Sequence, residues 1–177
     1  MTPFPPIERW QLPRAACERT RTALLPAGRR GSESGVFWAG RRQTMTTISA
    51  VIFPTGPGVV EAPGRWSVTP EVYAAVASWA KPRGLSLLAV VHTHLEHVPP
   101  RLSRTDRTQG LKVPDALAVI IGRGGDEPDL DAWGWFVYDD GEYRALGSAE
   151  CAERLELVGG TIDVVTITAA VPIEAAP

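Results

Sequence analysis

The stretch from Leu85 to Val91 is a nearly continuous run of apolar residues. A short run of this kind, without alternation of polar and apolar side chains, is typical of a strand that is buried on both faces of a sheet. It follows the clearest helix pattern in the chain, for which Thr69 is a suitable cap and Pro70 suits the first turn. A buried strand directly after an amphipathic helix favours an α/β fold.

The rest of the chain supplies further elements in an order that defines the fold class. A helix is predicted from Pro13 to about Leu25, stopped by Pro26 and Gly28. The Asp-Asp-Gly segment at 139–141 predicts a hairpin. The order of the elements is helix, two strands, helix and then several strands. This order predicts a single α/β domain with a mixed sheet and flanking helices. The predicted strands cover residues 33–40, 45–53, 85–91, 116–121, 132–138 and 142–146, with one more hairpin as an option over 155–168.

Length and composition restrict the domain organisation. With 177 residues, of which 44% are apolar, the chain is long enough for one well-packed domain and short for two. We predict a Pro-rich, loosely held N-terminal segment over 1–12, one folded domain over 13–148, and a C-terminal extension with possible strands over 149–177. The six tryptophans are expected to fill the core rather than to form a ligand cage.

Charge and cysteine usage exclude several classes of function. The net charge of −2 argues against nucleic acid as the main partner. No segment approaches the ~20 continuous apolar residues of a membrane span, and the first six residues lack the basic-then-apolar order of a signal peptide. Two isolated cysteines, Cys17 and Cys151, suggest neither a disulfide framework nor a cysteine-rich zinc module. We therefore expect a cytoplasmic protein with no membrane attachment.

Two histidines end the buried apolar run. In a strand, residues two apart point to the same face, with Cα atoms about 6.6–6.8 Å apart. His92 and His94 can therefore aim both imidazoles at one metal ion while Thr93 points away. Two histidines that merely reach water are the simpler alternative, but their place at the end of a buried strand favours a metal. A catalytic zinc takes three protein ligands and keeps a fourth position for water, so a third ligand is required.

Three residues are candidates for the third ligand: Glu96, His97 and Asp106. If the strand continued straight, Glu96 would lie about 13 Å from His92 along the chain axis. Asp106 follows a loop with two prolines that lets the chain turn back, so geometry favours Asp106. The His-x-His-x-Glu-His order also suggests metallo-β-lactamase-like hydrolases, but those sites and cupin sites need further histidines. The chain has three in all, and none follows His97.

The segment around Ser103 carries two further signals. Ser103-x-x-Asp106 matches a helix capping box, and a capped turn would also hold both residues rigidly toward the metal. Arg101, Arg104 and Arg107 flank the site. Contact with an acidic partner surface and simple exposure to solvent are both open explanations for these charges.

Taken in order, these residues resemble the pattern of the JAMM (MPN-domain) metalloproteases. That pattern is a glutamate well upstream, then His-Ser/Thr-His-Pro, a spacer, and Ser-x-x-Asp. The stretch 33–40 resembles the family's opening strand, which contains the glutamate and commonly ends in glycine. Leu95 stands where the family usually has proline, and the spacer has eight residues where seven are usual. The resemblance covers roughly residues 13–147, and the matching positions are Glu33, His92, His94, Ser103 and Asp106.

The resemblance implies an MPN (cytidine-deaminase-like) architecture and a zinc-dependent isopeptidase or peptidase. In the family's terms, His92, His94 and Asp106 bind Zn²⁺ with water as the fourth ligand. Glu33 is the general base that takes a proton from that water, and Ser103 donates a hydrogen bond to the developing oxyanion. The reaction is hydrolysis of an amide bond.

The same resemblance implies the partners. Family members usually cleave after the C-terminal Gly-Gly of ubiquitin or a ubiquitin-like protein, so a ubiquitin-like modifier or its conjugates is the expected substrate. Associated activating or conjugating enzymes are further candidate partners. Three alternatives stay open: processing of a sulfur-carrier protein, a peptidase for small γ- or C-terminal amides, and a metal-free MPN scaffold. The filled ligand positions argue against the scaffold.

Overall fold

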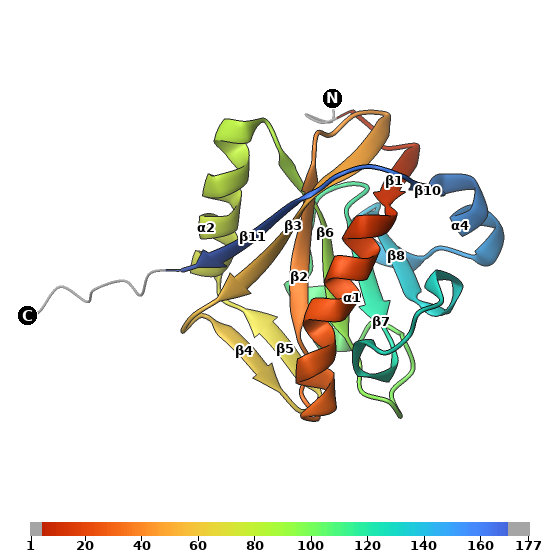
Figure 1. Cartoon of the computed structure of the whole chain (residues 1–177). Helices are drawn as coiled ribbons and strands as arrows, with labels where there is room; N and C mark the ends of the chain where they lie inside the picture. The colour runs from red at the N-terminus through yellow and green to blue at the C-terminus, as the bar shows by residue number, and fades with distance from the viewer. Residues whose placement is uncertain (1–4, 170–177) are drawn as a thin grey trace, which may run out of the picture.

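The computed structural model describes residues 5–169 and shows a large mixed sheet with helices packed on it (Figure 1). The strand order is β10-β1-β3-β2-β6-β7-β8-β9, and β11 also pairs with β3. The predicted α/β fold with a mixed sheet and flanking helices is confirmed. The strands of this sheet are β1 (Arg9–Pro13), β2 (Gly35–Gly40), β3 (Met45–Thr55), β6 (Ser86–Thr93), β7 (Leu117–Ile121), β8 (Gly134–Asp139), β9 (Glu142–Ala145), β10 (Leu155–Val158) and β11 (Asp163–Thr168).

Four α-helices and a separate hairpin complete the described chain. Two of the helices are long and pack on the sheet, whereas the other two are short. The hairpin forms its own two-stranded sheet. The helices are α1 (Arg14–Arg29), α2 (Pro70–Ala80), α3 (Arg104–Gln109) and α4 (Ser148–Arg154), the hairpin strands are β4 (Val59–Ala62) and β5 (Arg65–Val68), and short 3₁₀ turns are η1 (Lys81–Arg83), η2 (Arg123–Gly125) and η3 (Leu130–Ala132).

Strand β6 lies in the middle of the sheet, antiparallel to β2 and parallel to β7. Its residues from Leu88 onward are buried, as the apolar run predicts. Val91 belongs to a core cluster that includes residues of α1, whereas Val90 belongs to a second cluster that includes residues of α2. Successive β6 side chains therefore enter two separate layers of core, which explains why the run shows no polar alternation.

Helix α1 covers one face of the sheet, and α2 lies on the other (Figure 1). The buried indole Nε1–H of Trp38 on β2 donates a hydrogen bond to Thr20 Oγ1 of α1, with an N···O distance of 2.8 Å. In α2, Pro70 occupies the first turn, and the buried side chains of Val72 and Val76 face the sheet. These helices leave the end of β6, beyond Thr93, at the rim of the sheet.

The chain ends differ in part from the expectations. Residues 9–12 are not loosely held, because β1 pairs with both β10 and β3. The possible strands of the C-terminal extension are present, but they do not form the optional hairpin over 155–168: β10 runs parallel to β1, and β11 runs parallel to β3. Strands from both terminal segments thus join the sheet of the core. The rest of those segments, residues 1–4 and 170–177, lies outside the described residues.

Helix α1 does not stop at Pro26 but continues to Arg29. A proline there removes one intrahelical hydrogen bond, and the burial of Leu24 and Ala27 in the same turns outweighs that loss. The helix ends instead beyond Gly28, whose Cα lies against the backbone of Gly124 in η2. Tertiary packing thus overrides the local stop signal.

Other local patterns were correct. The hairpin β8–β9 forms around Asp140 and Gly141, whose φ angles are 46° and 88°. Five of the six tryptophans are buried, and Trp79 is half-buried with the Arg83 guanidinium over its ring. The hairpin β4–β5 and helix α4 were not predicted. Within the described residues, no helix is long and apolar enough to cross a membrane.

The contact between Gly28 and η2 generates a test of the fold. A Cβ atom at Gly28 would lie 1.9 Å from the carbonyl oxygen of Gly124, which is backbone and cannot rotate away. We expect Gly28→Ala to lower the free energy of unfolding by about 1–3 kcal/mol, measured by urea denaturation. Gly122→Ala is the matched control, since Gly122 has φ −69° and open space around it. Equal stability of Gly28→Ala and wild type would contradict the packing described.

Candidate metal centre

The two histidines lie at the end of β6, and both are 4% exposed. They share the face of the sheet that carries Val90, because strand residues two apart point the same way. The backbone of His94 is fixed beyond the strand: its N–H donates to Ile121 (2.9 Å), and its carbonyl accepts from Gly124 (2.7 Å). The predicted orientation of both imidazoles toward one point is therefore present.

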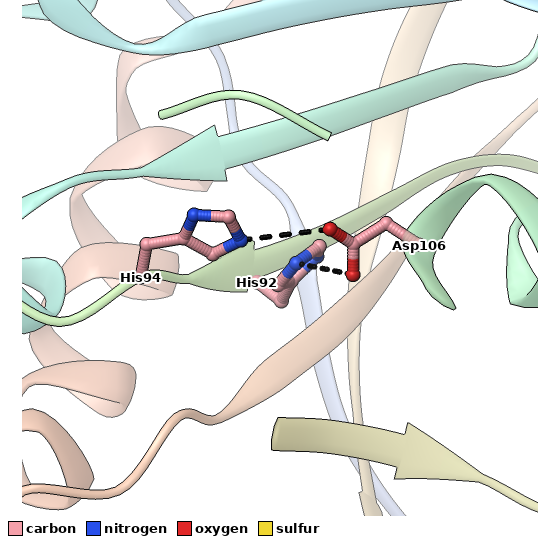
Figure 2. A group of neighbouring side chains, drawn as sticks. All are labelled: His92, His94 and Asp106. Carbon is pink, nitrogen blue, oxygen red and sulfur yellow. Dashed lines mark ion pairs between the residues drawn. The ribbon is translucent and has the colours of Figure 1, made fainter. Parts of the chain in front are cut away.

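Asp106 comes from α3 and meets both histidines (Figure 2). Its Oδ1 lies 3.2 Å from His92 Nε2, and its Oδ2 lies 3.6 Å from His94 Nε2. One potential ligand atom from each of the three residues lies within 4.8 Å of the others. The three side chains are positioned to hold one metal ion. The other two candidates for the third ligand, Glu96 and His97, are exposed on the loop and are not in this group.

The orientation of each imidazole has an identifiable cause. His94 Nδ1 lies 3.0 Å from the carbonyl oxygen of Pro99, to which it donates in the tautomer that leaves Nε2 free. A hydrogen bond of this kind fixes the ring of a metal-binding histidine. His92 stacks on Trp66, with ring centroids 6.0 Å apart and planes at 18°. Trp66 fits there because Gly35, the register partner of His92, has no side chain: a Cβ would lie 2.7 Å from the indole.

His92 provides a test of whether the site fits a metal. Its Nε2 is at ion-pair distance from Asp106, yet neither ring nitrogen makes a hydrogen bond with the described residues, although both are buried. A buried polar atom without a partner typically costs about 1–3 kcal/mol. The contact of Nε2 with Asp106 Oδ1 lacks the geometry of a hydrogen bond, and coordination of an ion through Nε2 would give this atom a bonded partner. Two imidazoles and a carboxylate are a donor set that zinc prefers, so the residues fit Zn²⁺.

The charges of the three residues support the same assignment. Burial alone would raise the pKa of Asp106, but its contacts with His92 and His94 outweigh burial and hold that pKa well below its usual range. Burial would lower the pKa of His94, but Asp106, Pro99 and Glu33 raise it on balance. Asp106 is thus an anion at neutral pH, as a carboxylate ligand must be.

Glu33 lies two residues before the start of β2 and is 5% exposed. Its backbone N–H donates to the Ala62 carbonyl of β4 (3.0 Å). Since Gly35 pairs with His92 in antiparallel register, continuing that register carries Glu33 toward His94. The pKa of Glu33 agrees with this position. Burial raises it, and the charges of the nearby His94 and His92 partly offset that rise. The structure therefore brings Glu33 beside the candidate metal centre.

Ser103 is the N-cap residue of α3, and the predicted capping box is confirmed. Its Oγ accepts from the Asp106 N–H (3.1 Å), and its own N–H donates to Asp106 Oδ2 (2.7 Å). Ser103 is exposed, so the hydroxyl hydrogen is available to a ligand. Its role as oxyanion donor stays a prediction.

Helix α3 buries none of its own side chains, so hydrogen bonds from other elements hold it. The Tyr73 hydroxyl of α2 donates to the Gln109 carbonyl (2.6 Å), and the Tyr143 hydroxyl of β9 donates to the Leu111 carbonyl (2.8 Å). Arg107 returns a hydrogen bond to the Tyr143 carbonyl (2.7 Å). Neither tyrosine was recognised from the sequence, because no local pattern links them to α3.

The hairpin β4–β5 was also missed, although it supplies Trp66 and touches the strand that follows Glu33. The Ser34 hydroxyl donates to Glu61 of β4. A signal was present, since the Pro63-Gly64 turn separates two short segments with β-branched residues. Between the hairpin and α3 lies a narrow cavity of about 20 Å³ that reaches His92 and Asp106. Its lining includes Trp66, Tyr73, Val90, His92, Leu102 and Asp106.

Comparison with known proteins gives fold information only. No protein-family model matches the chain, and no curated protein matches its sequence. The solution structure of protein DSY2949 from Desulfitobacterium hafniense aligns with a TM-score of 0.62 and 17% identity, over 86% of this chain and 94% of that one. AF2198, a JAB1/MPN domain protein from Archaeoglobus fulgidus, aligns with a TM-score of 0.44 and 14% identity, over 85% and 98%. The first likeness supports the fold, and the second is too distant to carry an argument.

The anchoring of α3 generates a test of the metal centre. Tyr73→Phe removes one hydrogen bond from the helix that carries Asp106. We expect zinc affinity to fall by about tenfold, as for other groups that orient a ligand, measured by competition with a fluorescent chelator. Tyr138→Phe is the matched control, because the Tyr138 hydroxyl makes no hydrogen bond with the described residues. Wild-type affinity in a folded Tyr73→Phe protein would contradict the anchoring role.

Proposed function

We propose that the chain is a JAMM-type (MPN-domain) zinc peptidase that cleaves the amide bond after the C-terminal Gly-Gly of a ubiquitin-like protein. One observation carries this proposal: His92, His94 and Asp106 lie together, and the β2–β6 register brings the buried Glu33, which is distant in sequence, toward His94. Metal-binding residues alone would fit a structural ion. A buried carboxylate beside them supplies the base that hydrolysis needs.

Zn²⁺ bound by the three residues would polarise the substrate carbonyl and lower the pKa of water from 15.7 toward ~7. Glu33 takes a proton from the attacking water, whose oxygen forms a bond to the carbonyl carbon. Glu33 then gives that proton to the departing amine as the C–N bond breaks. Its raised pKa suits this double role, because a carboxyl group buried at 5% exposure holds a proton more readily than one in water.

Ser103 would stabilise the oxyanion. Its hydroxyl oxygen accepts from the Asp106 N–H, and its hydroxyl hydrogen has no acceptor among the described residues, so it can be donated to a ligand. Loss of one oxyanion donor typically costs ~10²–10³ in rate. The capping box would fix Ser103 and Asp106 relative to each other, so oxyanion donor and metal ligand would move as one unit.

The surroundings of the centre support a narrow, extended substrate. The cavity beside His92 and Asp106 is small and is bounded by Trp66 and Leu102, which favours residues without large side chains at the cleaved bond. The two-stranded hairpin next to it has unpaired edges within the described residues, and an extended tail can bind such an edge through main-chain hydrogen bonds. A Gly-Gly tail meets both requirements. Deconjugation, precursor processing and processing of a sulfur-carrier protein share this chemistry, and activating or conjugating enzymes are further proposed partners.

Substitution of Glu33 tests the proposal directly. We expect Glu33→Gln to retain stoichiometric zinc and to lose turnover by at least ~10²-fold, because the base is removed and the ligands are not. His94→Ala should lose both. Zinc is measured by elemental analysis, and turnover by cleavage of Gly-Gly-tailed fusion proteins.

Glu96→Gln provides the matched control, since Glu96 is exposed on the loop after His94. It should leave both zinc content and turnover unchanged. Full activity of Glu33→Gln would refute the assigned mechanism. Purified wild-type protein that contains no zinc, takes none up and cleaves nothing would favour the scaffold alternative.

A further inference from the structure

Two arginines flank Ser103 and have no acidic partner. Arg101 lies two residues before Ser103, and Arg104 follows it. Both are exposed, and neither side chain makes a hydrogen bond or ion pair with another described residue. The backbone N–H of Arg101 donates to the Pro99 carbonyl (2.7 Å), the same group that orients His94. The loop that carries Arg101 is therefore built into the metal centre.

The other charges around the centre do not cancel these two. Arg65 on β5 bonds only the Ser67 hydroxyl (3.3 Å), and Arg107 on α3 bonds a carbonyl. Apart from Asp106, the acidic residues of the loop, α3 and the hairpin are Glu96 and Glu61. Besides Asp106, the loop, α3 and the hairpin thus carry four arginines and two glutamates.

The centre itself contributes little net charge once an ion is bound. An ion bound there would offset the negative charge of Asp106 and of an ionised Glu33. The formal charge of the loop, α3 and the hairpin is therefore positive, which favours the approach of an acidic group. The cluster of arginines needs an explanation that zinc binding does not provide.

We infer that the site takes substrates with carboxylate side chains within about three residues of the cleaved bond, held by Arg101 and Arg104. This inference rests on the proposed function. A carbonyl placed at Ser103 lies within about 7 Å of the backbone of either arginine, since two residues span at most that distance. A guanidinium binds carboxylate through two parallel hydrogen bonds, which a simple point charge does not offer.

The expected effect is modest and depends on salt, because exposed ion pairs are weak and screened. The probes are fluorescent peptides with an internal Gly-Gly amide. In one series, two Asp, two Asn or two Lys residues come before that bond, and in the other series they come after it. Their binding to zinc-loaded Glu33→Gln protein is measured by anisotropy. We expect the Asp peptide of one series to bind roughly three- to tenfold more tightly than its Asn counterpart at low salt, and the difference to disappear at high salt.

Charge reversal assigns the preference to residues. We expect the double variant Arg101→Glu/Arg104→Glu to invert the preference for acidic peptides. The double variant Arg101→Gln/Arg104→Gln should abolish this preference. The matched control is Arg14→Glu/Arg19→Glu, which changes the net charge equally on α1, against the opposite face of the sheet. This control should keep the preference. Each variant is first shown to bind zinc as the parent does.

The outcomes separate this inference from the proposed function. Equal binding of Asp and Asn peptides in both series, or a preference that survives Arg101→Gln/Arg104→Gln, overturns the inference and identifies the arginines as solvent-exposed charges only. Cleavage without a charge preference leaves the peptidase standing and the inference refuted. A charge preference in a wild-type protein that cleaves none of the substrates keeps the acidic-ligand site and refutes the peptidase.

Discussion

The antiparallel pairing of β2 with β6 is the interaction on which the rest of the structure depends. It sets Gly35 opposite His92, and a slip by one residue would turn both histidines to the other face of the sheet. The register is specified by apolar side chains: Val36 enters the core under α1, and Phe37 enters the core under α2. The same pairing delivers Glu33 to the end of β6. The placement of Glu33 near the two histidines is therefore a consequence of core packing.

Asp106 shows how one side chain can meet a folding requirement and a binding requirement together. Its Oδ2 accepts the Ser103 N–H that would otherwise be unsatisfied at the start of α3, while Oδ1 lies near His92 Nε2. A helix of six residues that buries no side chain is marginal by itself. Hydrogen bonds from Tyr73 and Tyr143 near its far end compensate, so a short element can hold Asp106 in a defined orientation.

The sequence predicted those parts of the molecule that depend on local patterns. The buried strand before His92, helix α2, the β8–β9 hairpin and the capping box follow from periodicity, caps and turn residues. The parallel pairing of β1 with β10 and of β11 with β3 joins segments that are distant in the chain, and no local signal encodes such partners. For the same reason the stacking of Trp66 on His92 was not foreseen. Helix α1 passed Pro26 because tertiary burial overrode a local preference.

A crystal structure of the protein grown with zinc, with anomalous data at the zinc edge, tests the central claim most directly. The account predicts one strong peak about 2.0–2.2 Å from a nitrogen of each histidine, His92 and His94, and from an oxygen of Asp106. It also predicts the Glu33 carboxylate within about 2.6–3.2 Å of the fourth, non-protein ligand. Zinc bound elsewhere, or bound to the three residues with Glu33 turned away from the ion, would contradict it.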